Sequence, residues 1–180
     1  MKSLCLSGEH ILACLVLVAG SAGVVAAQSG SDASMGDKHF VSEALKGGQA
    51  EVEMGQIAEQ KGNSSDVKSF GKRMVADHTK LVEQMKSVAS EEGITPPTSP
   101  TVMQQAEIKK LKGLSGDAFD QEYIKAMVKD HESDLNDFKK EAQGGTSAIV
   151  KDAASQGATV ISEHLTMIRQ IAQAHGVSGK

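Results

Sequence analysis

The sequence is poor in cysteine and in aromatic residues. Its two cysteines, Cys5 and Cys14, both lie in an apolar N-terminal stretch, so the rest of the chain offers neither a disulfide nor a thiolate metal site. Tryptophan is absent, and aromatic residues make up only 3% of the chain. With few rings for stacking and a net charge of -4, the chain has no surface suited to phosphates and bases. We therefore expect no nucleic-acid partner.

Known catalytic motifs are missing as well. The chain has no glycine-rich phosphate loop, no G-x-S-x-G turn and no Cys-x-x-Cys pair. These absences remove most conventional enzyme classes. The sequence therefore favours a protein that is not an enzyme.

The N-terminal stretch has the pattern of an export signal. Lys2 precedes the apolar run ILACLVLVAGSAGVVAA, which ends in small residues before Gln28. We expect residues 1–27 to be a signal peptide and the protein to be exported to the periplasm or cell envelope. The alternative is an uncleaved anchor, which would be its only contact with a membrane. Residues 28–36 are rich in serine, glycine and aspartate and are predicted to be a flexible lead.

The remaining chain, residues 37–176, has the periodicity of helices and no alternation of period two. Long amphipathic segments are expected at about 37–61, 65–92, 116–143 and 147–175, with a short helix at about 101–112. Tight breaks make the first two long helices antiparallel, and likewise the last two. The long connection between the two pairs is sufficient to return along the bundle. The pattern thus predicts an all-α, ferritin-like four-helix bundle with a short crossover helix.

Histidines recur on this pattern in a way that suggests a site. The stretches FGKRMVADH and YIKAMVKDH end in Asp-His pairs, and a Glu-His pair follows near the end of the chain. Each long helix places one titratable residue on its apolar seam at a similar height along the bundle. Imidazole and carboxylate ligands suit zinc, iron, manganese or copper. The predicted ligands of one transition metal ion are Glu51, His78, His131 and His164.

Neighbouring residues are predicted to support these ligands. An acid next to a histidine could orient an imidazole on an adjacent helix. The supporting residues predicted on this basis, together with the tyrosine before His131, are Asp77, Asp130, Glu163 and Tyr123. Two other interpretations remain open. The histidines could be core polar residues of a structural or partner-binding bundle, or the chain could be an oxidoreductase that uses iron near Tyr123.

Four segments of the chain resemble a known family. They are FVSEALKGGQAEVEMGQIA, VKSFGKRMVADH, SGDAFDQEYIKAMVKDHESDLNDFKKEA and EHLTMIRQIA. They are similar to the family called domain of unknown function 4142, exported bacterial proteins grouped with ferritin-like folds. By this resemblance, the motif positions are Glu51, Asp77, His78, Phe119, Asp120, Tyr123, His131 and His164.

The chain departs from di-iron ferritin-like proteins, which carry Glu-x-x-His on two helices. No helix here has that motif. A mononuclear, histidine-rich site therefore fits the residues better than a carboxylate-bridged pair of irons. We expect an exported bundle with a role in metal handling or envelope stress.

Overall fold

The computed structural model describes residues 32–177, so the predicted signal peptide at 1–27 lies outside the described residues. All regular structure in the described part is helical. Its helices are α1 (Met35–Lys61), α2 (Ser65–Glu91), α3 (Val102–Gly113), α4 (Gly116–Gly144) and α5 (Ala148–Ala174). Each boundary lies within two residues of the prediction. Among the described residues, no helix is long and apolar enough to cross a membrane.

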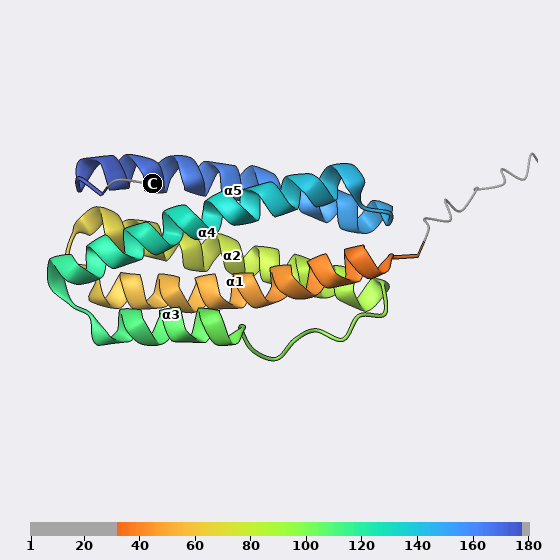
Figure 1. Ribbon diagram of the computed structural model, residues 1–180, viewed down its shortest axis with the longest axis horizontal. Helices are drawn as coiled ribbons and strands as arrows, with labels where there is room; N and C mark the ends of the chain where they lie inside the picture. Colours follow the sequence, from red (N-terminus) through yellow and green to blue (C-terminus); the bar gives the residue numbers. More distant parts are fainter. Residues whose placement is uncertain (1–31, 178–180) are drawn as a thin grey trace, which may run out of the picture.

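The long helices form a four-helix bundle with the predicted topology. α1 and α2 form one antiparallel pair, and α4 and α5 form the other (Figure 1). α2 packs against α5 and α4 packs against α1, so α2 and α4 lie on a diagonal. These two helices run in the same direction because the connection between them, which includes α3, returns along α1 (Figure 1). The ferritin-like arrangement with a crossover helix is confirmed.

The bundle begins earlier than the sequence suggested. Ser34 caps α1: its side chain accepts a hydrogen bond from the main chain of Asp37, whose carboxylate accepts one from the main chain of Ser34. The main-chain N–H of Ala33 donates to Glu92 Oε2 at 3.0 Å. The segment predicted as a flexible lead over 28–36 therefore already has fixed structure at its last residues. The serine- and glycine-rich composition predicted a flexible segment, whereas the capping box of Ser34 and Asp37 indicates the start of a helix.

A buried acid closes the opposite end of the bundle. Asp120 of α4 accepts hydrogen bonds from the main-chain N–H groups of Asn63 and Ser64, both at 2.8 Å. Ser64 occupies the N-cap position of α2, but its own side chain makes no capping bond. Asp120 thus ties α4 to the turn between α1 and α2, which gives this motif position a structural role.

The interior is divided into two apolar clusters. The cluster at the α1–α2 turn includes Met54, Phe70, Met74, Phe119 and Ile124. The cluster at the other end includes Leu45, Val82, Phe138, Val150 and Ile161. A layer of polar side chains is buried near the middle of the four long helices, between these clusters: Glu51, His78, His131 and His164.

Two glycines allow α1 and α2 to approach closely at one point. A Cβ atom on Gly71 would lie 2.7 Å from the carbonyl oxygen of Gly55 and 2.9 Å from the main-chain nitrogen of Glu59. Since both neighbours are backbone atoms, they cannot move aside as a side chain would. The close approach holds the two helices in one register and helps to fix the height of the polar layer on each.

Candidate metal centre

Three histidines meet in the core, each from a different helix. His78 is on α2, His131 on α4 and His164 on α5, and all three are buried. Their ring centroids lie 5.1 to 5.7 Å apart. One ring nitrogen from each residue lies within 4.8 Å of the other two. The sequence predicted that these three histidines would converge, because each lies on the apolar seam of its helix at a similar height along the bundle.

The other ring nitrogen of each histidine has its own hydrogen-bond partner. His78 Nδ1 lies 2.9 Å from Glu51 Oε2. His164 Nε2 lies 3.1 Å from Asp77 Oδ2, and His131 Nδ1 lies 2.9 Å from the carbonyl oxygen of Met127. A carboxylate or carbonyl behind each imidazole is the arrangement that orients metal-binding histidines in proteins.

These partners determine where the protons lie. A carbonyl oxygen only accepts, so His131 carries its proton on Nδ1, and its buried Nε2 has no hydrogen-bond partner among the described residues. If both carboxylates are ionised, His78 and His164 likewise present lone pairs on the nitrogens that face each other. Those atoms, His78 Nε2 and His164 Nδ1, are 3.2 Å apart. Such a contact needs a shared proton or a cation between the two rings.

The charges and burial around the cluster favour ionised Glu51 and Asp77 and a neutral imidazole at His131 and His164. Burial alone would raise the pKa of Glu51, but the charge and hydrogen bond of His78 outweigh it and hold that pKa below its ordinary range. Asp77 behaves in the same way, because Arg73 and His164 overcome its desolvation and lower its pKa. Burial lowers the pKa of His131 to about 4. Burial also lowers the pKa of His164, helped by the neighbouring His78.

Glu51 lies beside the histidine cluster rather than in it. The sequence predicted it as a fourth ligand, but its Oε2 is bonded to His78, and the convergent set contains only the three histidines. Glu51 is therefore placed to orient His78. Its second oxygen, Oε1, lies 3.6 Å from His131 Nδ1.

Asp134 is a site residue that the sequence analysis did not single out. It follows His131 by three positions on α4, so it shares the same helix face. Burial and then the charge of Glu51 raise the pKa of Asp134 to about 9, and the protonated acid donates a hydrogen bond to the Glu51 carboxylate. The i, i+3 spacing from His131 was the signal that could have revealed it.

The structure places the four predicted supporting residues in different surroundings. Asp77 orients a histidine on another helix, as predicted. Asp130 makes no hydrogen bond to the three histidines within the described chain; burial and the nearby Glu51 raise its pKa to about 6. Glu163 is exposed and lies 3.6 Å from Arg73. It therefore contacts the site only indirectly, because Arg73 is hydrogen-bonded to Asp77.

Tyr123, the fourth predicted supporting residue, is set apart from the histidines. Its ring stacks on Phe119 with centroids 5.9 Å apart. Phe70 packs against Tyr123 on one side and His131 on the other, with both centroid distances at 6.3 Å. Burial raises the pKa of Tyr123 well above its ordinary value, and its hydroxyl has no hydrogen-bond partner among the described residues. The side chain belongs to the apolar core.

Comparison with known proteins places the chain in a family. The model of the domain of unknown function DUF4142 matches residues 22–171. The chain belongs to the DUF4142 family. This family membership confirms the resemblance found in the sequence. None of the curated proteins matches the chain.

Several solved structures share the fold of this DUF4142 protein. A DUF305 fragment from Deinococcus radiodurans superposes with a TM-score of 0.71 at 12% identity, over 80% of this chain and 99% of that one. A DUF305 protein from Streptomyces coelicolor gives 0.68 at 16% identity, over 81% and 96%. CopM in a Cu(I)-bound form gives 0.64 at 16% identity, over 77% and 96%. At such low identity these likenesses establish the helical fold alone.

Proposed function

We propose that this protein binds one transition metal ion through His78, His131 and His164, and that it handles metal in the cell envelope. The observation that carries the proposal is the convergence of three imidazole nitrogens within 4.8 Å. Metal–nitrogen bonds of about 2 Å place the nitrogens of one ion about 3.3 Å apart. Small rotations of the rings would bring the three atoms to that spacing.

The hydrogen bonds behind the rings support the same function. Glu51, Asp77 and the Met127 carbonyl each accept from the nitrogen that points away from the cluster. The inward nitrogens are then free to donate electron pairs to a cation. Each ligand is held in one tautomer and one orientation, which is the preorganisation a metal centre requires.

The ligand set favours copper or zinc among the four ions that the sequence suggested. Neutral imidazole suits both, whereas manganese prefers oxygen ligands and non-haem iron commonly takes a carboxylate beside two histidines. Glu51 adds one negative charge beside the rings, which partly balances a bound cation. The Cu(I)-bound state of CopM, a protein with the same fold, is consistent with copper but comes from a distant relative.

Export supports a role in the envelope. The signal-like segment 1–27 precedes the bundle, and the structural neighbour from Streptomyces coelicolor is described as secreted. An exported bundle with one closed imidazole site would bind a metal ion in the envelope and keep it from other ligands. The buried position of the site suits storage or transfer better than catalysis on a large substrate.

A structural role for the histidines is the competing function. The chain Glu51–His78–His164–Asp77 is continuously hydrogen-bonded, so it could also serve as a polar core that fixes the helix register. That function leaves unexplained the buried Nε2 of His131, which has no hydrogen-bond partner among the described residues, and a metal ion would explain it.

Metal titration separates these two functions. All proteins would carry Cys5→Ser and Cys14→Ser, because thiolates bind the same ions. The test variant is His131→Leu, and the matched control is His175→Leu, which removes an imidazole at the C-terminal end of α5, outside the histidine cluster. Binding of Co²⁺, Zn²⁺ and Cu⁺ would be followed by competition with a chelator, and Co²⁺ also by its visible absorption.

We expect one ion per chain for the parent protein and the control. His131→Leu should weaken binding at least about 100-fold, because losing only a residue behind a ligand already costs about 10- to 100-fold. If Co²⁺, Zn²⁺ and Cu⁺ all fail to bind the parent protein, the histidines are core architecture and the metal function is wrong.

A further inference from the structure

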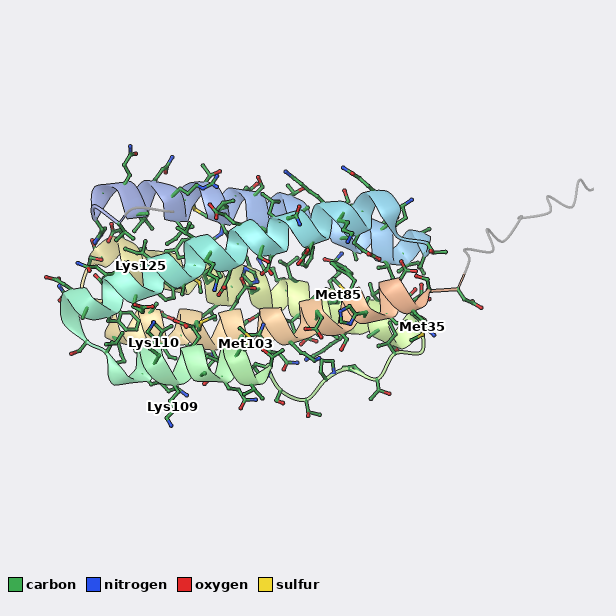
Figure 2. The ribbon with its side chains drawn as sticks, viewed as in Figure 1. Met35, Met85, Met103, Lys109, Lys110 and Lys125 are labelled. Atoms are coloured by element: carbon green, nitrogen blue, oxygen red, sulfur yellow. The ribbon has the colours of Figure 1, made fainter. Side chains whose placement is uncertain are left out.

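A cavity of about 560 Å³ connects the polar layer with one face of the bundle. It lies between α1, α2 and α4, and its inner wall includes Glu51 and His78. Further out it is lined by residues from the first half of α1 and the last part of α4. Met85 of α2, labelled in Figure 2, also lines it. The cavity therefore leads to the edge of the histidine cluster.

The lining of this cavity is strongly acidic. Its carboxyl groups come from Glu43, Glu51, Asp134, Asp137 and Glu141, of which Asp134 keeps its proton at neutral pH, against Lys140 and the exposed His39. Carboxylates around a concave, low-dielectric space focus the electric field and concentrate cations there. Acidic residues alone are common on protein surfaces, so their charge by itself does not define a route for cations.

The Glu51 carboxylate lies at the inner end of the cavity. Glu51 is only 4% exposed, and it forms part of the cavity wall. Its Oε2 is bonded to His78. Among the described residues no N–H group donates to its Oε1; the further donor to this carboxylate is the protonated Asp134. Two neighbouring buried carboxyl groups can both ionise only if something positive reaches them, so a cation can take the place of the Asp134 proton.

The opposite approach to the cluster is less suited to a cation. Asp77, the last member of the hydrogen-bonded chain on that side, is hydrogen-bonded to Arg73. Lys80 lies 3.6 Å from the same carboxylate. A metal cation approaching Asp77 would meet these two positive side chains, whereas along the cavity it meets carboxylates, of which Glu43 is paired with Lys46 at 2.7 Å.

We propose that the acidic cavity is the route by which metal cations reach the three histidines, with Glu43 and Asp137 as the outer carboxylates that attract them. Glu51 stands at the inner end and passes the ion to His78, whose ring it holds. This inference rests on the proposed metal function. It adds the side from which the ion enters and a reason for the acidic lining of the cavity. Metal binding by the three histidines requires neither.

Kinetics test the route separately from the site. Co²⁺ would be mixed rapidly with the full chain carrying Cys5→Ser and Cys14→Ser, and uptake followed by the absorption of the imidazole-bound ion. One variant removes the outer charge, Glu43→Gln with Asp137→Asn. The matched control removes the same charge from exposed residues outside the cavity, Glu59→Gln with Asp152→Asn.

A second variant blocks the cavity without changing its charge. Gly47 lines the cavity, and a Cβ atom there would have only Gln104 Nε2 nearby, at 3.8 Å. Gly47→Leu therefore places a side chain into the space, and leucine favours a helix more than glycine does. Because it obstructs the path without touching the ligands, it should slow uptake and release together.

We expect the outer-charge variant to take up Co²⁺ about 5- to 10-fold more slowly at low salt, with a weaker salt dependence. Gly47→Leu should slow both directions at least about 10-fold and leave the equilibrium constant within a factor of about three. The control should match the parent. Unchanged rates in both variants, with intact equilibrium binding, would overturn the route and leave the metal function standing. Failure of the parent to bind Co²⁺ overturns both.

Discussion

Replacing His131 by leucine tests the electrostatics of the site in the absence of metal. The imidazole is fully buried, and burial, the largest influence on it, lowers its pKa to about 4. Glu51 opposes that shift, and the two other histidines add to it. Leucine is similar in size and apolar, so it should keep the core filled while removing the only titration at this position.

The direction of the effect follows from proton uptake. Above pH 6.5 the imidazole is neutral in both the folded and the unfolded chain. As the pH falls from 6.5 towards 4, the unfolded chain binds a proton that the folded chain refuses, so stability is lost across that window. A shift from about 6.5 to about 4 corresponds to about 3 kcal/mol, since one pKa unit equals about 1.4 kcal/mol.

Urea unfolding at pH 7, 5.5 and 4 with a chelator present would measure this effect. The carboxylates and remaining histidines are common to both proteins, so their titrations largely cancel in the difference between parent and His131→Leu. We expect that difference to move by about 3 kcal/mol in favour of the variant between pH 7 and pH 4. A difference that stays constant within about 0.5 kcal/mol would refute a buried neutral imidazole at this position.

Three further predictions concern neighbouring residues. Asp134→Asn should become progressively more stable than the parent as pH rises from 4 to 9, because the folded parent holds a proton that the unfolded chain releases. The difference in melting temperature between variant and parent should therefore be larger at pH 8 than at pH 5. Gly71→Ala should destabilise the fold by about 1 to 3 kcal/mol in urea, since its Cβ would meet the Gly55 carbonyl; a neutral effect contradicts the close approach. Glu51→Gln should lower metal affinity about 10- to 100-fold, measured by chelator competition, because His78 loses an ionised acceptor.

The helices and their order could be predicted because they depend on local signals. Apolar residues at helical spacing, breaks such as KGNSS and GGTS, and the prolines near residue 97 set the boundaries within two residues. The common height of the histidines followed from counting residues along parallel and antiparallel helices. These inferences needed no knowledge of side-chain rotamers.

The roles of Glu51 and Asp134 could not be predicted in this way. Whether a seam carboxylate binds a metal or orients an imidazole depends on distances of about 1 Å, which periodicity does not fix. The bond between Glu51 and His78, and the proton on Asp134, result from the packing of α1 against α2 and α4. Both are tertiary properties.

The two Asp-His motifs show how the same sequence acquires different roles. In each motif the aspartate lies about 100° around the helix from its histidine and so faces an adjacent helix. α2 packs against α5, where Asp77 meets His164. α4 packs against α1, whose residue in the polar layer is Glu51 rather than a histidine. Asp130 therefore faces a carboxylate, and its raised pKa reflects burial together with that negative charge.

Glu51 thus makes the site asymmetric. A histidine in its place would give each of the four helices one imidazole, with no carboxylate in the polar layer and no charge to balance a cation. With glutamate, one side of the layer carries a negative group that faces the acidic cavity, and the other side ends at Asp77 with Arg73 bonded to it. Under the proposed metal function, this one residue supplies the acceptor that orients His78, compensates the bound cation and determines the side from which the cation approaches.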